Sequence, residues 1–285
     1  MADKDYLAGR VRELAQRTWQ NDFLTHTAFL TLAEQARIRG IAGYGAAALP
    51  VTGDGQCLTG ALAGVPFVLY GGFEEAERRV LCFLPSYLEA EDFAMSAGET
   101  VSCIEVRPLN VRFADKLTHR DFLGALMNLG LERDQIGDIV VRRGGEGEEQ
   151  AKSGGTDCAY IFAISDAAEV ICSELTRVKH TSVMGKVVPA GECVVRPAFE
   201  IREGSVASER LDAVLAFVFR LSRQAAQDKV AAEEVFVDGV TASSAGMSLK
   251  TGSRVSLRGC GKFVYEGELH ETRKGRCFVR VKLFV

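Results

Sequence analysis

The sequence has few of the residues that form metal sites or disulfide frameworks. It contains four histidines and eight cysteines, and the cysteines form no short-spaced pair with one another or with a histidine; they stand at positions 57, 82, 103, 158, 172, 193, 260 and 277. Structural zinc sites need such pairs, and small secreted domains need a regular cysteine framework. We therefore expect reduced thiols, no metal and no other cofactor.

Long apolar runs are also missing. No stretch approaches the roughly twenty apolar residues of a membrane span, and the first five residues lack the basic start of a signal peptide. At 285 residues, with 47% hydrophobic and 25% charged residues, the chain has the composition of a globular protein of two or three domains. We expect a cytoplasmic protein without membrane contact, and a monomer.

Nucleotide-binding and catalytic motifs are absent as well. Gly43-Tyr44-Gly45 and Gly53-Asp54-Gly55 belong to neither a GxxxxGK nor a GxGxxG pattern. His119-Arg120-Asp121 resembles part of a kinase catalytic loop, but the required downstream Asn and the separate Asp-Phe-Gly are missing. Acid–base chemistry by His119 is the alternative to a capped helix with surface charges, and the capped helix fits better because no nucleophile lies at a fixed spacing. We assign no catalytic residue.

The first 90 residues predict two helices followed by strands. Apolar residues at helical spacing, including Phe23 and Phe29, indicate amphipathic helices between Tyr6 and Arg39, with a break near Asn21 and an end at Gly40. Trp19 is expected in the core or at its edge. An apolar run covers 65–70, and a strand is expected at 80–84.

The middle of the chain alternates strands and helices. Strands are expected at 101–109, 138–141 and 158–164, and helices at 118–129 and 167–175, which describes a small α/β sandwich. Thr118 is expected to cap the first of these helices, and Gly130 to end it. The run 142–155 is rich in Gly, Glu, Lys and Ser and predicts a mobile loop. Residues 187–203 are expected to complete this domain before a linker at 204–207.

Residues 208–285 predict a helix pair on a small sheet. Ser208 and Ser222 each precede a short apolar-periodic run that a hydroxyl would cap, and Val235, Val237 and Val240 begin a series of alternating strands. From residue 207 onward there are 13 Lys and Arg against 9 Asp and Glu, a net charge of about +4 in a chain whose total is −4. This excess is typical of a phosphate-binding surface, and a solvated basic face is the alternative.

Five motifs in this segment resemble the S-four RNA-binding domain. They are Ser208-x-Arg210-Leu211-Asp212, Leu221-Ser222-Arg223, Val235-x-Val237-Asp238-Gly239, Leu249-Lys250-x-Gly252 and Gly259-x-Gly261-Lys262-Phe263. Two positions differ from the usual pattern, because Asp238 replaces an Asn and Ser253 replaces an Asp. The resemblance and the local charge together predict an RNA-binding surface; its residues are Arg210, Arg220, Arg223, Lys229, Lys250, Arg258 and Lys262. Leu211 and Val237 are expected in the core.

The segment from Thr118 to Leu131, followed by Ile136-Gly137-Asp138-Ile139, resembles the YlmH family of bacterial RNA-binding proteins. The resemblance implies an α+β chain of three small domains: an N-terminal α/β domain at 1–90, a central domain like the RNA recognition motif at 91–203, and the S-four domain at 207–285. Residues 158–162 occupy a strand position without the aromatic RNA-stacking pattern of that motif. A possible accessory contact combines His119 and Arg120 with Lys179 and Lys186.

The family resemblance implies a non-catalytic protein that binds rRNA of the large ribosomal subunit, with tRNA as a further candidate partner, and acts on stalled subunits. Two other classes of function fit the sequence: an RNA-modifying enzyme of the pseudouridine-synthase type, and an adaptor that links RNA binding to cell division. For the RNA-binding surface itself, Arg210→Ala with Arg223→Ala is expected to weaken RNA binding and leave the fold intact.

Overall fold

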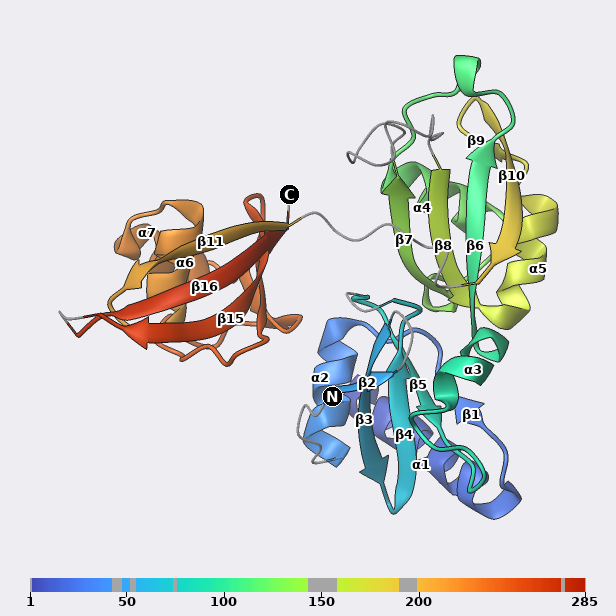
Figure 1. Ribbon diagram of the computed structural model, residues 1–285, viewed down its shortest axis with the longest axis horizontal. Helices are drawn as coiled ribbons and strands as arrows, with labels where there is room; N and C mark the ends of the chain where they lie inside the picture. Colours follow the sequence, from blue (N-terminus) through green and yellow to red (C-terminus); the bar gives the residue numbers. More distant parts are fainter. Residues whose placement is uncertain are drawn as a thin grey trace. The chain divides into compact units, whose positions relative to one another are not determined.

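The computed structural model describes residues 2–42, 48–51, 55–73, 76–142, 158–189, 199–272 and 275–284. The chain divides into two compact units, Met1–Val195 and Arg196–Val285, which we call the N-terminal unit and the C-terminal unit (Figure 1). Both units combine helices with antiparallel sheets, so the fold class is α+β, as predicted. Residues 143–155 of the expected mobile loop lie outside the described residues.

The first sheet of the N-terminal unit has the strand order β1-β5-β4-β3-β2. Its elements are α1 (Ala2–Asn21), β1 (Thr25–His26), α2 (Leu32–Ala42), β2 (Ala48–Val51), β3 (Gly55–Leu62), β4 (Val65–Tyr70) and β5 (Val80–Phe83). Val11 and Leu14 of α1 and Ile38 of α2 pack with Phe67 and Leu81 on one face of the sheet. The two helices therefore bury one sheet face, since strand residues alternate between faces.

Three expectations for this region need correction. The break after Asn21 is confirmed, but Phe23 and Phe29 lie between α1 and α2 rather than in a helix, and α2 continues past Gly40 to Ala42. Trp19 is 74% exposed and not part of the core. The buried position beside it belongs to Thr18, whose hydroxyl hydrogen-bonds that of Thr25 at 2.8 Å and so joins α1 to β1.

The second sheet of the N-terminal unit has the order β7-β8-β6-β10-β9. Its elements are α3 (Phe93–Ser96), η1 (Ala97–Glu99), β6 (Val101–Pro108), η2 (Val111–Phe113), α4 (His119–Asn128), η3 (Arg133–Gln135), β7 (Ile136–Arg142), β8 (Cys158–Ile164), α5 (Ser165–Glu174), β9 (Arg177–Val178) and β10 (Thr181–Val188). The predicted strands and helices are confirmed to within two residues at each end. The order β6-α4-β7-β8-α5-β10 is a βαββαβ unit, and α4 and α5 share one apolar core with it.

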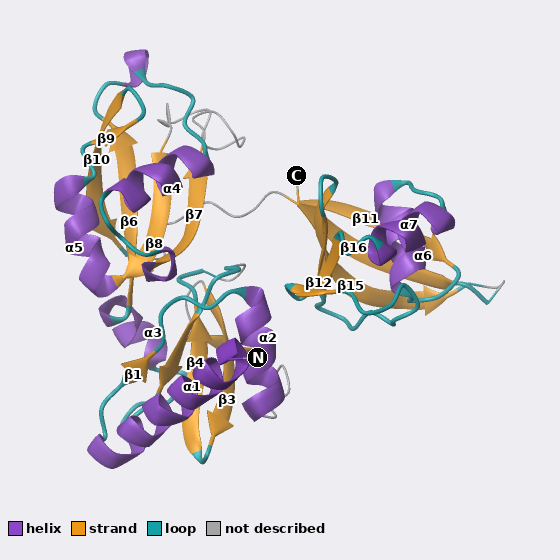
Figure 2. Cartoon of the chain, turned by 180° about the vertical axis from the view of Figure 1, so that it is seen from behind, coloured by secondary structure: helices purple, strands orange, loops and turns teal. Residues whose placement is uncertain are grey.

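The two sheets of this unit share a core on the face that α4 and α5 leave open (Figure 2). Phe162 of β8 is fully buried there, with its ring centroid 5.0 Å from that of Phe73. A Cβ on Gly72 would lie 2.1 Å from the Phe162 ring, and one on Gly137 would lie 2.6 Å from Phe29. These positions require glycine because the two sheets approach too closely for a side chain.

Polar contacts complete this junction. Arg78 donates from Nε to the carbonyl of Ile136 at 3.1 Å and from Nη2 to the carbonyl of Phe29 at 2.9 Å. The Asp138 carboxylate accepts from the backbone N–H of Glu77 at 2.6 Å. Burial lowers the pKa of Arg78, and Asp138 acts in the opposite direction. The Ile136-Gly137-Asp138 part of the family segment therefore has a structural role, holding one sheet to the other.

The C-terminal unit has one sheet of order β11-β16-β15-β14-β12-β13 with two helices on one face. Its elements are β11 (Phe199–Val206), α6 (Leu211–Phe219), α7 (Arg223–Ala231), β12 (Val235–Val237), β13 (Val240–Thr241), β14 (Arg254–Leu257), β15 (Gly261–Glu271) and β16 (Cys277–Phe284). Leu211 and the other apolar residues of α6 pack against Val255, Phe263 and Val281, as predicted. Val240 is an exception, because it is 48% exposed.

The strand β11 corrects the expected end of the central domain. Residues 199–206 pair with β16 along their whole length, from Phe199 opposite Phe284 to Val206 opposite Cys277. Part of the segment assigned to the central domain, and most of the expected linker at 204–207, therefore form an edge strand of the C-terminal sheet. The sequence did not predict this strand, because the apolar Ile201 lies on its exposed face and its charged residues do not follow the regular alternation of a half-buried strand.

Candidate nucleic-acid interface

The helices α6 and α7 begin at neighbouring places in the C-terminal unit. Ser222 caps α7 as predicted, because its hydroxyl accepts from the N–H of Ala225 at 3.0 Å. Ser208 does not cap α6. The first N–H groups of that helix, on Leu211 and Asp212, instead donate to the carbonyls of Met247 and Ala245. A loop more than thirty residues later in the chain therefore holds the start of α6.

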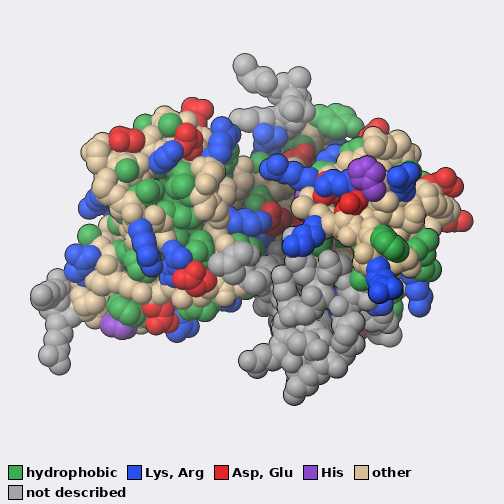
Figure 3. All heavy atoms as spheres, turned by 90° about the horizontal axis from the view of Figure 1, so that it is seen from above, with side chains coloured by type: hydrophobic (Ala, Val, Ile, Leu, Met, Phe, Trp, Pro, Cys, Tyr) green, Lys and Arg blue, Asp and Glu red, His purple; other side chains and the backbone are tan. Residues whose placement is uncertain are grey.

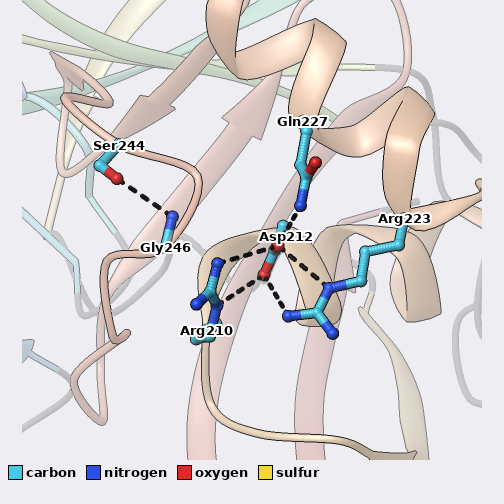
Figure 4. A network of polar contacts seen from close by, with 6 residues as sticks. All are labelled: Arg210, Asp212, Arg223, Gln227, Ser244 and Gly246. Atoms are coloured by element: carbon cyan, nitrogen blue, oxygen red, sulfur yellow. Dashed lines mark hydrogen bonds and ion pairs between the residues drawn. The ribbon is translucent and has the colours of Figure 1, made fainter.

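A buried carboxylate joins the two helix starts (Figure 4). Asp212 has no exposed side-chain surface. Its oxygens accept from Nε and Nη2 of Arg210 at 3.2 and 3.3 Å, and from Nε and Nη2 of Arg223 at 3.0 and 3.3 Å. Gln227 adds a fifth hydrogen bond at 2.8 Å. We call these four residues the Asp212 cluster.

The electrostatics of the cluster favour an ionised Asp212. Burial alone would raise its pKa, but hydrogen bonds from Arg223, Gln227 and Arg210 outweigh that effect and hold the pKa well below its ordinary value. One negative charge thus faces two positive charges, and the cluster keeps a net positive charge. The arginine side chains remain 43% and 47% exposed. Each guanidinium donates to Asp212 through Nε and Nη2, so its Nη1 group takes no part in the contact with Asp212.

The loop at 244–247 covers one side of Arg210. A Cβ on Gly246 would lie 3.0 Å from Nη2 of Arg210, so a larger residue there would displace the guanidinium. The Gly246 N–H donates to the hydroxyl of Ser244 at 3.2 Å (Figure 4). The sequence analysis named Arg210 and Arg223 but missed the roles of Gln227 and Gly246. The position of Gln227, four residues after Arg223 on one helix, was the available signal.

The seven predicted RNA-binding residues do not lie on a single face. Arg220 and Lys250 are both exposed. Arg220 ends α6 in a left-handed conformation, three residues before Arg223. Lys250 follows Ser248 and Leu249, which pair with Arg210 and Glu209. Lys229 also lies on the helices, where it is ion-paired with Glu234 at 2.6 Å. Five predicted residues therefore belong to the helix side of the domain.

The other two predicted residues lie on the opposite sheet face. Lys262 precedes the buried Phe263 on β15, and its Nζ lies 4.7 Å from the centroid of the Phe284 ring. The guanidinium of Arg258 lies 5.7 Å from the ring of Phe236, whose neighbour Val235 is in the core. Alternation along a strand places these side chains away from α6 and α7.

The two departures from the usual S-four pattern are turn residues. Asp238 and Gly239 have φ angles of 50° and 77° and join β12 to β13, and an Asp-Gly pair suits such a turn. The Asp238 carboxylate accepts from the N–H of Arg254 at 2.9 Å. Ser253 is buried, and its hydroxyl accepts from the N–H of Lys250 at 3.3 Å. The carboxylate of Asp238 therefore shapes the turn. This role is the alternative to a position beside a bound phosphate, where a carboxylate would weaken the contact.

The accessory residues of the central region are only partly together. Asp121 accepts from the N–H and hydroxyl of Thr118 at 2.8 and 2.7 Å, which confirms the predicted cap, and from Nζ of Lys179 at 2.8 Å. His119 and Arg120 are exposed in the same helical turn. Lys186 lies farther along β10, in register with Glu105. Lys179 thus joins the start of α4, whereas Lys186 stands apart.

Comparison with known proteins identifies the family to which the chain belongs. Residues 91–148 match the family described as "Putative RNA-binding domain in YlmH". The ribosome-associated protein quality control protein P2 of Bacillus subtilis (strain 168) is 31% identical over 205 residues, which cover 70% of this chain and 71% of that protein. The chain belongs to the YlmH family. Among solved structures, the cell division protein YlmH from Streptococcus pneumoniae resembles 68% of this chain and 96% of its own, with 17% identity and a TM-score of 0.45.

Within this YlmH family member, the matched residues 91–148 contain β6, α4 and β7 but not the Asp212 cluster. Cys82, Cys103 and Cys158 are buried. In the part of the chain that the structure describes, no group of His, Cys, Asp and Glu could hold a metal ion. The described helices also include none long and apolar enough to cross a membrane.

Proposed function

We propose that this YlmH family member is a non-catalytic RNA-binding protein that docks on rRNA of the large ribosomal subunit in the rescue of stalled ribosomes. The Asp212 cluster is the observation that carries the proposal. Guanidinium forks held in place by a buried carboxylate lose little conformational freedom when they bind phosphate, and phosphate contacts supply most of the affinity for folded RNA.

The proposed contact surface is the helix side of the C-terminal unit, with Arg210, Arg220, Arg223 and Lys250 as its main cations. Lys229 contributes less because Glu234 neutralises it. The name of the Bacillus subtilis relative supports a ribosomal partner, and the 31% identity supports a shared role. Peptidyl-tRNA on the stalled subunit is a further candidate partner on the same surface.

Sedimentation with purified ribosomal subunits over a salt series tests this proposal. We compare wild type with Arg220→Gln/Lys250→Gln, which removes two exposed charges outside the cluster, and with Arg210→Gln/Arg223→Gln. The matched control is Arg280→Gln/Lys282→Gln, because both residues lie on the opposite sheet face and pair with Glu203 and Glu266. It removes the same charge from another surface.

Wild type is expected to migrate with the large subunit in a salt-sensitive way. Each lost phosphate contact should reduce the slope of log affinity against log salt by about 0.7–0.9. Both helix-side variants should show this reduction, and the control should not. Equal behaviour of control and helix-side variants would remove the assigned surface. Migration of wild type with neither subunit would overturn the ribosomal function.

A further inference from the structure

A short segment between β6 and α4 carries large apolar side chains into solvent. Leu109 is 63% exposed, Val111 is 54% exposed and Phe113 is 81% exposed. Residues 111–113 form the single turn η2, which lies at one end of the second sheet, beside β9 and β10 (Figure 1). We call residues 109–116 the tip. Apolar side chains exposed together, as opposed to scattered singly, mark contact surfaces, so the tip is a candidate contact surface.

The tip is firmly held. The Asn110 side chain accepts from the N–H of Arg112 at 3.1 Å, and the N–H of Leu109 donates to the carbonyl of Ser182 at 2.9 Å. The N–H of Asp115 donates to the hydroxyl of Thr181 at 2.8 Å, while its carboxylate accepts from the N–H of His180 at 3.0 Å. Phe113 is therefore presented on a fixed backbone, and little order has to be gained when it binds.

The surroundings of the tip are basic. Exposed cations lie in the tip itself, in the first turn of α4 and in the β9–β10 hairpin; they are Arg112, Lys116, Arg120 and Arg177, whereas Lys179 is ion-paired with Asp121. Its two carboxylates are already engaged, Asp115 by the hairpin and Asp121 by Lys179. In the space-filling view, Lys and Arg side chains gather around histidine on this end of the N-terminal unit (Figure 3).

We propose that the tip is a second RNA contact, in which Phe113 stacks on an unpaired base while Arg112 and Lys116 bind the neighbouring phosphates. An exposed aromatic ring between cations suits a base flanked by phosphates. The sheet face that could otherwise stack bases is buried against the first sheet, with Phe162 inside it. The inference rests on the proposed function, since the ligand is again RNA.

A fluorescence experiment reports directly on the stacking. Trp19 is the sole tryptophan, so the double substitution Trp19→Phe/Phe113→Trp places the only indole at the tip. The probes are an RNA hairpin with an unpaired loop and a blunt duplex of the same stem. Quenching of the indole fluorescence by the hairpin, but not by the duplex, is the expected result. Bases that stack on an indole quench it, whereas a duplex offers no free base face.

Equilibrium binding of the full chain to the labelled hairpin gives the energetic test. Phe113→Ala should weaken binding by about 5- to 160-fold, the range that corresponds to losing one base–aromatic stack, and Phe113→Tyr should restore it. The matched control is Tyr87→Ala, because Tyr87 is 71% exposed elsewhere in the same unit. Thermal melts should be unchanged, since neither side chain is buried.

The outcomes separate this inference from the proposed function. Unchanged affinity in Phe113→Ala, together with no quenching, overturns the tip contact while the helix-side variants can still lose binding. Loss of subunit migration in Phe113→Ala with unchanged hairpin affinity means that the tip binds protein, which also overturns the RNA contact. Failure of wild type to bind hairpin, duplex or subunits overturns both proposals.

Discussion

Asp121 and Asp212 occupy comparable places in the sequence and different places in the structure. Each stands in the first turn of a helix with an arginine one or two residues before it. Asp121 lies near the surface, caps its own helix through Thr118 and meets one flexible lysine. Asp212 is buried and accepts five hydrogen bonds from two arginines and a glutamine. The first carboxylate completes a helix, and the second positions other side chains.

The difference shows what burial adds to an ion pair. Near the surface, water competes for both charges and the lysine keeps its rotamer freedom, so the pair contributes little. In a buried site the carboxylate has to be fully hydrogen-bonded, and that requirement fixes the orientation of each guanidinium. In the RNA contact that we propose, each arginine is thereby preorganised by a carboxylate that the RNA would not touch.

Truncating the residue beside Asp212 is expected to have the largest effect. Leu211→Ala removes a fully buried side chain from the core of α6 and the sheet and should lower the free energy of unfolding by about 2–5 kcal/mol. Denaturant unfolding followed by circular dichroism measures the loss. Val240→Ala, at a 48% exposed site in the same unit, is the control and should change little.

Neutralising the buried carboxylate tests the comparison directly. Asp212→Asn keeps the shape but leaves two guanidinium groups without their counter-charge, and we expect a loss of about 1–3 kcal/mol in the free energy of unfolding. Asp228→Asn on α7 makes the same chemical change at an exposed site. Equal losses in the two variants would mean that the Asp212 cluster does not stabilise the C-terminal unit.

Removing both arginines should now affect folding as well as binding. The sequence alone predicts that Arg210→Ala with Arg223→Ala leaves the fold intact. Because Asp212 would remain buried with only Gln227 as a side-chain partner, we expect a destabilisation of the order of 1–3 kcal/mol. Adding Asp212→Asn to this variant should recover part of the stability, which a double-mutant cycle measures. No recovery would show that the buried charge is not the cause.

Acid should weaken both sites in the same direction. Lys179 and Thr118 hold the pKa of Asp121 at about 2, and the Asp212 cluster also depresses the pKa of its carboxyl. A carboxyl with a depressed native pKa stabilises the fold above its unfolded value of about 3.9, and this contribution disappears as the pH falls further. Melting temperatures between pH 6 and pH 2 should therefore fall less steeply in Asp212→Asn than in wild type.

The smallest effect is expected at the surface carboxylate. Asp121→Asn removes the charge that Lys179 meets but keeps a group that can accept from Thr118. Amide hydrogen exchange should rise in the first turn of α4, while the melting temperature should fall less than in Asp212→Asn. A larger fall than in Asp212→Asn would reverse the order that burial predicts.

Local patterns predicted the elements well because they depend on neighbours in sequence. The strands at 101–108 and 158–164, the cap at Thr118 and the core role of Leu211 all follow from period and capping. Contacts between distant segments were not predictable. The start of α6 is held by carbonyls from residues 245 and 247, which have no side-chain signal, so Ser208 was wrongly assigned as its cap.

The candidate site also has a part that the local sequence predicts and a part that it does not. Charge and motif identified Arg210 and Arg223, and the motif also contained Asp212, but neither revealed that the carboxylate is buried between them. The tip was missed because Leu109, Val111 and Phe113 alternate like a strand that should be covered. Only the tertiary structure shows that the described residues leave these three side chains largely exposed.

The pairing of β11 with β16 has a practical consequence for dissection of the protein. The first and last strands of the C-terminal unit are neighbours, so a fragment that begins at Ala207 would strip the edge from the sheet and expose eight residues of β16. Exposed strand edges pair with other chains. We therefore expect such a fragment to self-associate, whereas one that begins at Arg196 keeps β11 as its edge strand.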